Sequence, residues 1–193
     1  MNYADFIATK QRSVKPMGFD VPLSSINPAL FDWQKRATQW ALKRGRAALF
    51  EECGLGKTLQ QLEWARHVHN ETKMPVVIHC PVGVRQQTKR ESVKFKIDCD
   101  VRVVDDCEQV IDGINLINYE KLHKFDTAIF GGVVLDESSI LKGMNSKTKS
   151  LLCESYHRTK YRLACTATPA PNDHMELGNH AQFLGVCEPV DML

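Results

Sequence analysis

The stretch Glu52-Cys53-Gly54-Leu55-Gly56-Lys57-Thr58 has the composition of a phosphate-binding loop, and it decides how the rest of the chain is interpreted. Such a loop needs glycines so that backbone N–H groups can close around a polyphosphate, a lysine that reaches the β- and γ-phosphates, and a hydroxyl that helps to hold Mg²⁺. A short apolar run at 46–50 precedes it, and residues 58–66 follow with helical spacing. A strand, a glycine turn and a helix N-terminus together form an anion site, because free N–H groups and the helix dipole point at the phosphates.

The loop departs from the general pattern at one position. In Gly-x-x-x-x-Gly-Lys-[Ser/Thr] the residue five before the second glycine is also glycine, whereas here it is Glu51. On this segment alone, a glycine turn before an ordinary helix therefore remains an alternative. If the segment is a phosphate-binding loop, the residues that contact the nucleotide are Gly54, Leu55, Gly56, Lys57 and Thr58, and Thr58 is also a metal ligand.

Composition and charge exclude several classes of protein. The 193 residues suit one domain, and 43% of them are hydrophobic, which is enough for a core. The net charge of +2 is too small to attract nucleic acid in bulk, so any such binding must come from a local face. No apolar run approaches the roughly 20 residues of a membrane helix, and the N-terminus lacks the layout of a signal peptide. We therefore expect no membrane partner.

The cysteines and histidines predict no metal site. There are seven cysteines, an odd number, and no pair is spaced Cys-x-x-Cys, so neither a zinc site nor a disulfide framework is expected. Free thiols in a reducing cytoplasm are the simple interpretation. His67 and His69 lie two positions apart and point in different directions from a helix, and we interpret both as surface residues.

Strand and helix patterns alternate along the chain. Residues 1–27 contain Pro16, Gly18, Pro22 and several Ser and are expected to form an extended arm, with a short helix at 3–10. Helical periodicity runs from Pro28 to Lys43, and Gly45 is the expected stop. Strand patterns occur at 46–50, 75–81, 101–104, 113–119, 132–137 and 161–166, and further helical patterns at 58–66, 85–95, 120–123, 147–157 and 175–184. This alternation predicts an α/β fold with helices on both faces of a mostly parallel sheet.

Two acids end the apolar run Val133-Val134-Leu135-Asp136-Glu137. In a parallel sheet, ligands bind at the carboxyl ends of the strands, which is where both acids would lie. Asp136 is then expected to bind Mg²⁺, and Glu137 to orient and deprotonate an attacking water. On their own, two acids at this point could equally begin a turn.

Two hydroxyls follow the last predicted strand, in Thr166-Ala167-Thr168-Pro169. We expect Thr166 and Thr168 to couple the state of the γ-phosphate to a nucleic-acid face through hydrogen bonds. The alternative is a turn rich in Ser and Thr before a proline, which is a common arrangement.

In this order, the motifs resemble those of the first RecA-like lobe of superfamily 2 helicases, most closely the Swi/Snf-like DNA translocases and their relatives in phages and prophages. The resemblance covers residues 28 to 185, and members of this group also lack the first glycine of the loop. It implies a three-layer RecA-like P-loop fold for 28–193, with ATP and Mg²⁺ as cofactors and with Lys57 and Glu137 as catalytic residues. Phe31-Asp32-Trp33-Gln34 is similar to the adenine-reading segment, in which Gln34 would pair with the base edge.

The same resemblance implies contacts with nucleic acid. Cys80-Pro81 and the residues that follow are similar to motif Ia, and Ile117-Asn118-Tyr119-Glu120 is similar to motif Ib. Asp136-Glu137-Ser138-Ser139 stands at motif II. Carried over from the family, the residues expected to contact the backbone of DNA, rather than RNA, are Arg85, Gln86, Tyr119 and Lys142. The basic residues near 89–96 and 142–149 would otherwise form ordinary solvated helix faces.

The expected partner is a second RecA-like lobe, in cis or in trans. In the family that lobe supplies arginines that neutralise γ-phosphate charge, and we expect none of its sheet within the 193 residues. The main hypothesis is a motor lobe that couples ATP hydrolysis to movement on DNA, in the cytoplasm of a bacterium or of a phage-infected host cell. The alternative is a nucleotide-dependent binding module without turnover. A small-molecule kinase is a distant third, since it would need neither the Thr-Ala-Thr-Pro segment nor Gln34.

Overall fold

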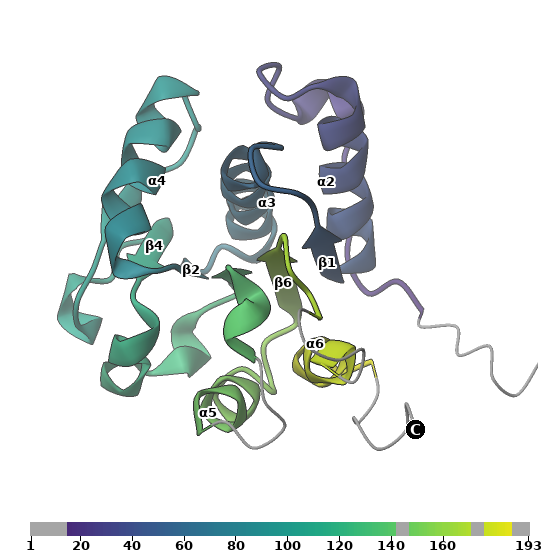
Figure 1. Ribbon diagram of the computed structural model, residues 1–193. Coiled ribbons are helices and arrows are strands. Elements are labelled where there is room, and N and C mark those ends of the chain that lie inside the picture. The colour runs from purple at the N-terminus through teal and green to yellow at the C-terminus, as the bar shows by residue number, and fades with distance from the viewer. Residues whose placement is uncertain (1–14, 142–146, 171–175, 187–193) are drawn as a thin grey trace, which may run out of the picture.

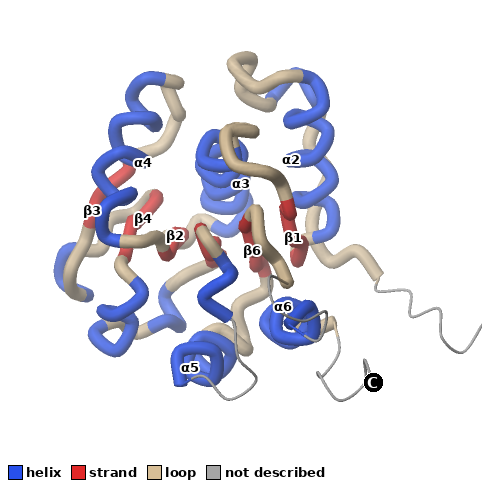
Figure 2. Tube along the Cα trace, viewed as in Figure 1, coloured by secondary structure: helices blue, strands red, loops and turns tan. Residues whose placement is uncertain are grey.

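The computed structural model of the chain describes residues 15–141, 147–170 and 176–186 (Figures 1 and 2). Its centre is a six-stranded sheet in the order β1-β6-β5-β2-β4-β3. Every neighbouring pair of strands is parallel, which confirms the predicted sheet. The strands are β1 (Arg46–Phe50), β2 (Val76–His79), β3 (Val101–Val103), β4 (Ile114–Ile117), β5 (Gly132–Asp136) and β6 (Tyr161–Thr166).

Helices cover both faces of the sheet and make the predicted three-layer arrangement (Figure 1). One face carries α2 (Asp32–Arg44), α3 (Lys57–Thr72) and α4 (Val82–Lys94), and the other carries α5 (Lys147–Ser155) and α6 (Glu176–Leu184). Short 3₁₀-helices lie between these elements: η1 (Leu23–Ser25), η2 (Cys107–Gln109), η3 (Tyr119–Lys124), η4 (Thr127–Ile129) and η5 (Ser138–Leu141).

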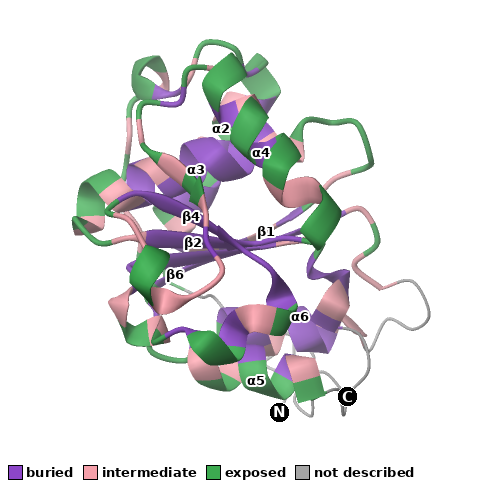
Figure 3. Cartoon of the chain, turned by 90° about the vertical axis from the view of Figure 1, so that its left-hand side faces the viewer, coloured by how far each residue is buried: buried purple, intermediate pink, exposed green. Residues whose placement is uncertain are grey.

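The inner strands β6, β5, β2 and β4 are buried on both sides, as Figure 3 shows for the sheet between its helices, whereas the edge strands β1 and β3 are partly exposed. Neighbouring residues of one strand enter different cores. Ile78 and Val134 pack with α2 and α3 in one cluster, and Val77 and Val133 pack with α5 and α6 in the other. A parallel sheet that is covered twice therefore reads as continuous apolar runs rather than as alternating ones.

Several element boundaries differ from those predicted. The first long helix begins at Asp32 rather than at Pro28, and it ends at Gly45 as expected, where φ is +75°. The helix expected at 85–95 begins at Val82, directly after Pro81. The short helix expected at 120–123 is the 3₁₀-helix η3.

The described part of the N-terminal segment lies against α2. The backbone N–H groups of Met17, Gly18 and Phe19 donate to carbonyls of the last turn of α2, and Ile26 is buried in the core. A Cβ on Gly18 would lie 1.8 Å from the Leu42 carbonyl oxygen, so only glycine allows this approach. The helix expected at 3–10 lies outside the described residues, and the domain boundary at 27/28 stays a prediction.

The interpretation of His67 as a surface residue is wrong. His67 is buried, and its Nε2 lies 3.1 Å from the carboxylate of Glu63, one turn earlier on α3. The reason is that α3 contacts the sheet and also α2 and α4, so more than one of its faces is covered. Within the described ranges, no helix is long and apolar enough to cross a membrane.

Candidate active site

The phosphate-loop candidate connects β1 to α3 at the carboxyl edge of the sheet. Gly54 and Gly56 have φ of +81° and +77°, in the left-handed region where side chains are strained. Gly56 also directly precedes α3, and a Cβ there would lie 2.6 Å from Nε2 of Gln34. Both the turn and its contact with Gln34 therefore depend on glycine.

The side chain of Lys57 folds back over this loop. Its Nζ donates to the carbonyl oxygens of Glu51 and Glu52, at 2.7 and 2.9 Å. The first N–H groups of a helix have no acceptor within the helix, and those of α3 open into the same loop. An anion bound there would meet these N–H groups together with the lysine ammonium.

Asp136 ends β5 and lies near the first turns of α3. Its Oδ1 accepts a hydrogen bond of 2.8 Å from Nε2 of Gln61, and burial raises the pKa of the carboxyl. Gln60, the preceding residue, instead donates 2.7 Å to Oε2 of Glu51. Neither glutamine was among the site residues predicted from the sequence, although Gln61 follows Lys57 by four residues and so shares its helix face.

Glu137 has the most constrained geometry of the expected catalytic residues. Its φ is +59°, which is rare for a residue with a side chain. Oε1 accepts hydrogen bonds of 2.7 Å from Oγ of Ser139 and from Oγ1 of Thr166. Thr166 is fully buried, and its hydroxyl also accepts the N–H of Thr168 at 3.0 Å. Of the two threonines expected to act in coupling, Thr166 thus contacts the carboxylate of the acid, and Thr168 is linked to it only through the Thr166 hydroxyl.

Gln34 lies between the loop and a neighbouring cavity. Its Oε1 accepts the N–H of Phe31 at 2.8 Å, and its Nε2 donates to the carbonyl of Leu55 at 2.7 Å. The cavity has a volume of about 490 Å³ and is lined by Ala29, Phe31, Trp33, Gln34, Gly54, Leu55, Gly56, Leu59, Glu91, Lys94 and Phe95. Aromatic rings beside a phosphate loop form a surface on which a planar base can stack.

The residues expected to contact nucleic acid are placed differently from one another. Gln86 is exposed on α4. Arg85 donates to Oδ1 of Asp105 at 2.8 Å, and Lys121 lies 2.7 Å from the same oxygen. These hydrogen bonds, first that of Lys121 and then that of Arg85, lower the pKa of Asp105 to about 2. Lys142 lies outside the described residues.

Tyr119 is buried rather than displayed on the surface. Its hydroxyl donates to the carbonyl oxygen of Asp136 at 2.7 Å, and only 7% of the residue is exposed. Its expected contact with nucleic acid stays a prediction. It does border a cavity of about 500 Å³, lined by Pro81, Val82, Asn118, Tyr119, Glu120, Glu137, Ser139 and Ile140.

The donor set suits a metal that is shared with a nucleotide. Among the described residues, no group of three or more His, Cys, Asp or Glu could hold an ion by itself. Mg²⁺ in nucleotide sites keeps several waters and takes one or two protein oxygens together with phosphate oxygens. Asp136 beside α3, with Thr58 in the first turn of that helix, supplies oxygens of this kind.

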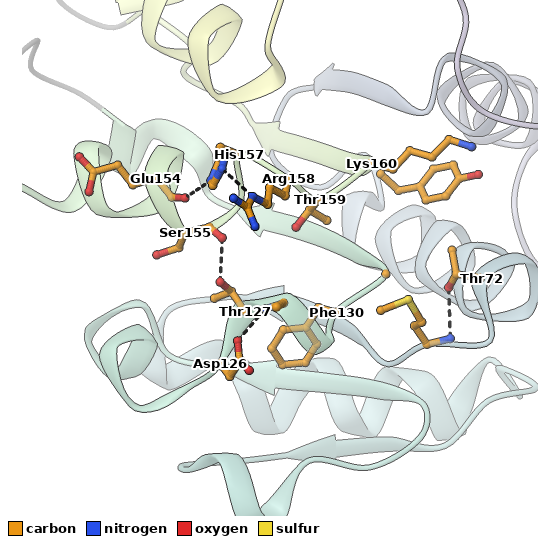
Figure 4. Close-up of a pocket in the computed structure, with 14 residues that line it drawn as sticks. Thr72, Asp126, Thr127, Phe130, Glu154, Ser155, His157, Arg158, Thr159 and Lys160 are labelled. Atoms are coloured by element: carbon orange, nitrogen blue, oxygen red, sulfur yellow. Dashed lines mark hydrogen bonds between the residues drawn. The ribbon is translucent and has the colours of Figure 1, made fainter.

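A larger cavity, of about 640 Å³, lies at the opposite edge of the sheet (Figure 4). Arg158 and Lys160, which precede β6, border it, and Thr127 donates there to the Ser155 carbonyl at 2.7 Å. Arg162 lies near the same edge, where its guanidinium donates to carbonyls of His157, Thr159 and Phe183. Neither Arg158 nor Arg162 therefore lies beside the phosphate loop.

With this geometry established, comparison with known proteins identifies the family. The model of the SNF2-related domain matches residues 33–188. The chain belongs to this family. Its Swi/Snf-like membership, expected from the motifs, is thereby confirmed, and the match begins at Trp33 and includes both the loop and the two acids.

Individual relatives agree with the family match. The DNA excision repair protein CSB of Oryza sativa subsp. japonica is 25% identical over 86% of this chain. The solved SWI2/SNF2 ATPase core of Sulfolobus solfataricus in complex with dsDNA is 25% identical, with a TM-score of 0.73 over 86% of this chain. The UvsW helicase of bacteriophage T4 shares the fold, with 15% identity and a TM-score of 0.68 over 97% of this chain and 66% of that one.

The chain is short beside these SNF2 relatives. It spans 18% of the length of the rice protein and 38% of the Sulfolobus ATPase core.

Proposed function

We propose that this chain is the ATP-binding lobe of a DNA-dependent ATPase that couples hydrolysis to movement on DNA. The observation that carries the proposal is the meeting of a phosphate loop and two acids at one sheet edge. There Lys57 begins α3, Asp136 accepts a hydrogen bond from Gln61 of that helix, and Glu137 accepts one from Thr166. An ordinary glycine turn would not need this arrangement.

Each residue has a role that its position supports. Lys57 and the loop from Gly54 to Thr58 bind the phosphates, and Gln34 reads the adenine edge from the adjoining cavity. Thr58 and Asp136 hold Mg²⁺, which neutralises phosphate charge when bound.

Glu137 accepts the proton of the attacking water. Thr166 and Thr168 report the state of this acid to the nucleic-acid face, because Thr166 joins the carboxylate to the backbone of the next loop.

Turnover is proposed to need a second RecA-like lobe, in cis or in trans. An arginine supplied at the γ-phosphate is worth roughly 10³–10⁵ in rate among related nucleotidases. Arg162 is engaged by three backbone carbonyls near the far edge of the sheet, so it does not supply this charge. The isolated chain is therefore expected to bind nucleotide and to hydrolyse it weakly or not at all.

DNA, rather than RNA, is the proposed track. The support is the family match and the SWI2/SNF2 ATPase core, whose structure was solved with dsDNA. Exposed Gln86, and the cavity that borders Glu137, lie at the carboxyl edge where a backbone could pass.

A nucleotide-dependent binding module is the second candidate. The observation in its favour is that the Lys57 ammonium donates hydrogen bonds to the carbonyls of Glu51 and Glu52, and these bonds must break before the lysine can reach a nucleotide. A loop that opens and closes with nucleotide could present a partner surface without any hydrolysis.

The deciding experiment measures ATP hydrolysis by the 193-residue chain, with and without duplex DNA, beside Glu137→Gln. DNA-stimulated turnover that is lost in the variant supports the motor lobe and implies that the chain completes its site by self-association. Bound ATP without turnover supports the need for a second lobe. Lys57→Ala is expected to abolish nucleotide binding, and unchanged ATP affinity in that variant would overturn the proposed site.

The phage or prophage type, and a bacterial or phage-infected host cell, are proposed from the motif resemblance alone. The genomic neighbourhood of the coding sequence tests both: phage structural and replication genes on either side support the proposal, and a chromosomal locus without them contradicts it.

A further inference from the structure

We propose that Tyr119 is a positioning residue that holds the peptide bond between Asp136 and Glu137 in its active orientation. The inference rests on the proposed function, because it concerns the acid that activates water. Tyr119 follows β4 and reaches across β2, and its hydroxyl donates to the Asp136 carbonyl at 2.7 Å. It touches neither carboxylate through this bond, so it acts through the backbone.

The bonded carbonyl belongs to the peptide plane that also sets the φ of Glu137. That φ is +59°, a conformation that a residue with a side chain keeps only when its surroundings enforce it. The plane is held at one end by the Tyr119 hydroxyl, and the Glu137 carboxylate is held at the other by Ser139 and Thr166, each at 2.7 Å. Removing the first restraint lets the plane rotate and the carboxylate leave its hydroxyl partners.

The ring of Tyr119 is itself held in place by the buried ring of His79. It stacks on His79, with ring centroids 5.3 Å apart and planes 27° apart. His79 is fully buried at the end of β2, and its Nε2 lies 2.5 Å from the hydroxyl of Tyr156. Burial lowers the pKa of His79 to about 3, so this support stays neutral across the physiological range. The tyrosine hydroxyl is thus pre-organised, which is what a positioning group needs.

Tyr119 also connects two parts of the site. The cavity of about 500 Å³ is bordered by Tyr119, Val82 and Glu137, and Val82 is 57% exposed. A ligand that pressed into this cavity would meet the ring whose hydroxyl holds the Glu137 peptide. Through the hydrogen bond from the Tyr119 hydroxyl to the Asp136 carbonyl, a ligand in this cavity would then change the orientation of Glu137.

The test compares Tyr119→Phe with Tyr161→Phe. Both changes remove one hydroxyl from a buried tyrosine, but Tyr161 begins β6 at the opposite edge of the sheet. The backbone amide and ¹³Cα NMR signals of Glu137, together with the affinity for a fluorescent ADP with Mg²⁺, are measured for each protein. We expect Tyr119→Phe to move the Glu137 signals and to leave ADP affinity within about twofold, whereas Tyr161→Phe leaves both unchanged.

Single-turnover hydrolysis with excess protein adds a kinetic readout where the wild-type chain turns over ATP, and the Glu137 NMR signals decide the inference where it does not. Tyr119→Phe should lower the rate constant by at least about tenfold without a matching loss of affinity, because a misplaced base affects chemistry rather than binding. Incorporating 3-fluorotyrosine at position 119, which keeps the hydroxyl, should retain the wild-type signals and rate. This conservative variant also controls for damage to folding.

Glu137 signals that stay unchanged in Tyr119→Phe would overturn the inference, even if the wild-type chain binds ADP. If the wild-type chain fails to bind ADP while the signals respond as expected, the positioning geometry stands and the proposed function fails. The two failures are therefore distinguishable in one set of samples.

Discussion

Gly54 and Gly56 of the candidate phosphate loop differ in what would oppose a side chain: the positive φ alone at Gly54, and both the positive φ and contact with Gln34 at Gly56. Both have positive φ, but a Cβ on Gly54 meets nothing within 4 Å, whereas one on Gly56 lies 2.6 Å from Gln34. Gly54→Ala should therefore lose only the left-handed preference, about 1–2 kcal/mol of unfolding free energy. Gly56→Ala should lose more and should also weaken ADP binding, since Gln34 must move.

Urea unfolding and ADP titration of both variants check this prediction, with Gly83→Ala as the control. A Cβ on Gly83 meets nothing, and its φ is not positive, so neither of these opposes a side chain there. Equal effects of the two loop variants on ADP affinity would show that the contact with Gln34 does not matter.

Gln61 has a consequence for metal binding that can be measured directly. Its amide fixes Oδ1 of Asp136 at 2.8 Å, and the neighbouring Gln60 is equally buried but bonds to Glu51. In Gln61→Leu the carboxylate loses its restraint, so the Mg²⁺ concentration that half-saturates ADP binding should rise by roughly tenfold, as for lost partners of metal ligands. Gln60→Leu should leave this Mg²⁺ dependence in place, and an equal rise in both variants would contradict the assignment.

The expected functional residues differ in how much of their role could be seen in the sequence. The placement of Lys57, Asp136 and Glu137 at one edge of the sheet could be predicted, because they stand in contiguous motifs at strand ends. The contacts of Gln61 and Tyr119 with Asp136 could not be predicted, since Gln61 lies 75 positions and Tyr119 lies 17 positions away from Asp136 in the chain. Such pairs become visible only once the strand order is known.

Helix α3 carries a fully buried carboxylate, that of Glu63. Asn27 donates its backbone N–H to Glu63 at 2.9 Å, and Arg66 donates to the same carboxylate. Burial alone would raise the pKa of Glu63, but the hydrogen bonds of His67, Arg66 and Asn27 outweigh it and hold the pKa at about 2. This cluster ties the N-terminal segment to α3.

The Glu63 cluster predicts a pH-dependent loss of stability. Because the folded pKa lies below the ordinary value of 4.5, the stabilisation is fully present above pH 4.5 and is lost as the pH falls toward 2. At pH 7, Glu63→Gln should lower the unfolding free energy on the order of 3 kcal/mol. Urea unfolding at pH 7 and pH 3 should show the difference between wild type and variant shrinking at the lower pH, and a constant difference would rule the cluster out as its cause.

The elements themselves were predictable where one physical signal dominated. The apolar runs between turn residues predicted all six strands, and for the inner four the reason is that buried parallel strands are mostly apolar. Helix starts were less visible: Gln34 accepts the N–H of Phe31 and so sets where α2 begins, and no periodicity records that bond. The burial of His67 was missed for a similar reason, since covering of α3 from several sides is a tertiary property.

At the scale of the whole molecule, a net charge of only +2 means that the proposed DNA binding would have to come from a local charged face. If phosphate contacts at the carboxyl edge supply the affinity, it should fall at least severalfold between 50 and 200 mM salt and should not depend on DNA sequence. Fluorescence anisotropy with two duplexes of different sequence checks both statements. Affinity that is unchanged at 200 mM salt would exclude phosphate contacts as its source.

The all-parallel sheet also divides the molecule into two kinds of vulnerability. Every strand starts at one rim, where Arg46 and Arg162 donate to carbonyls that follow α5 and to carbonyls at the end of α6. Every strand ends at the other rim, where the acids and the loop lie. Substitutions at the first rim should lower stability and so the amount of folded protein in the cell. Substitutions at the second rim should leave the protein folded but inactive. Under selection for heat tolerance, stabilising substitutions would then be expected at the rim that holds Arg46 and Arg162, and not at the loop or at Glu137.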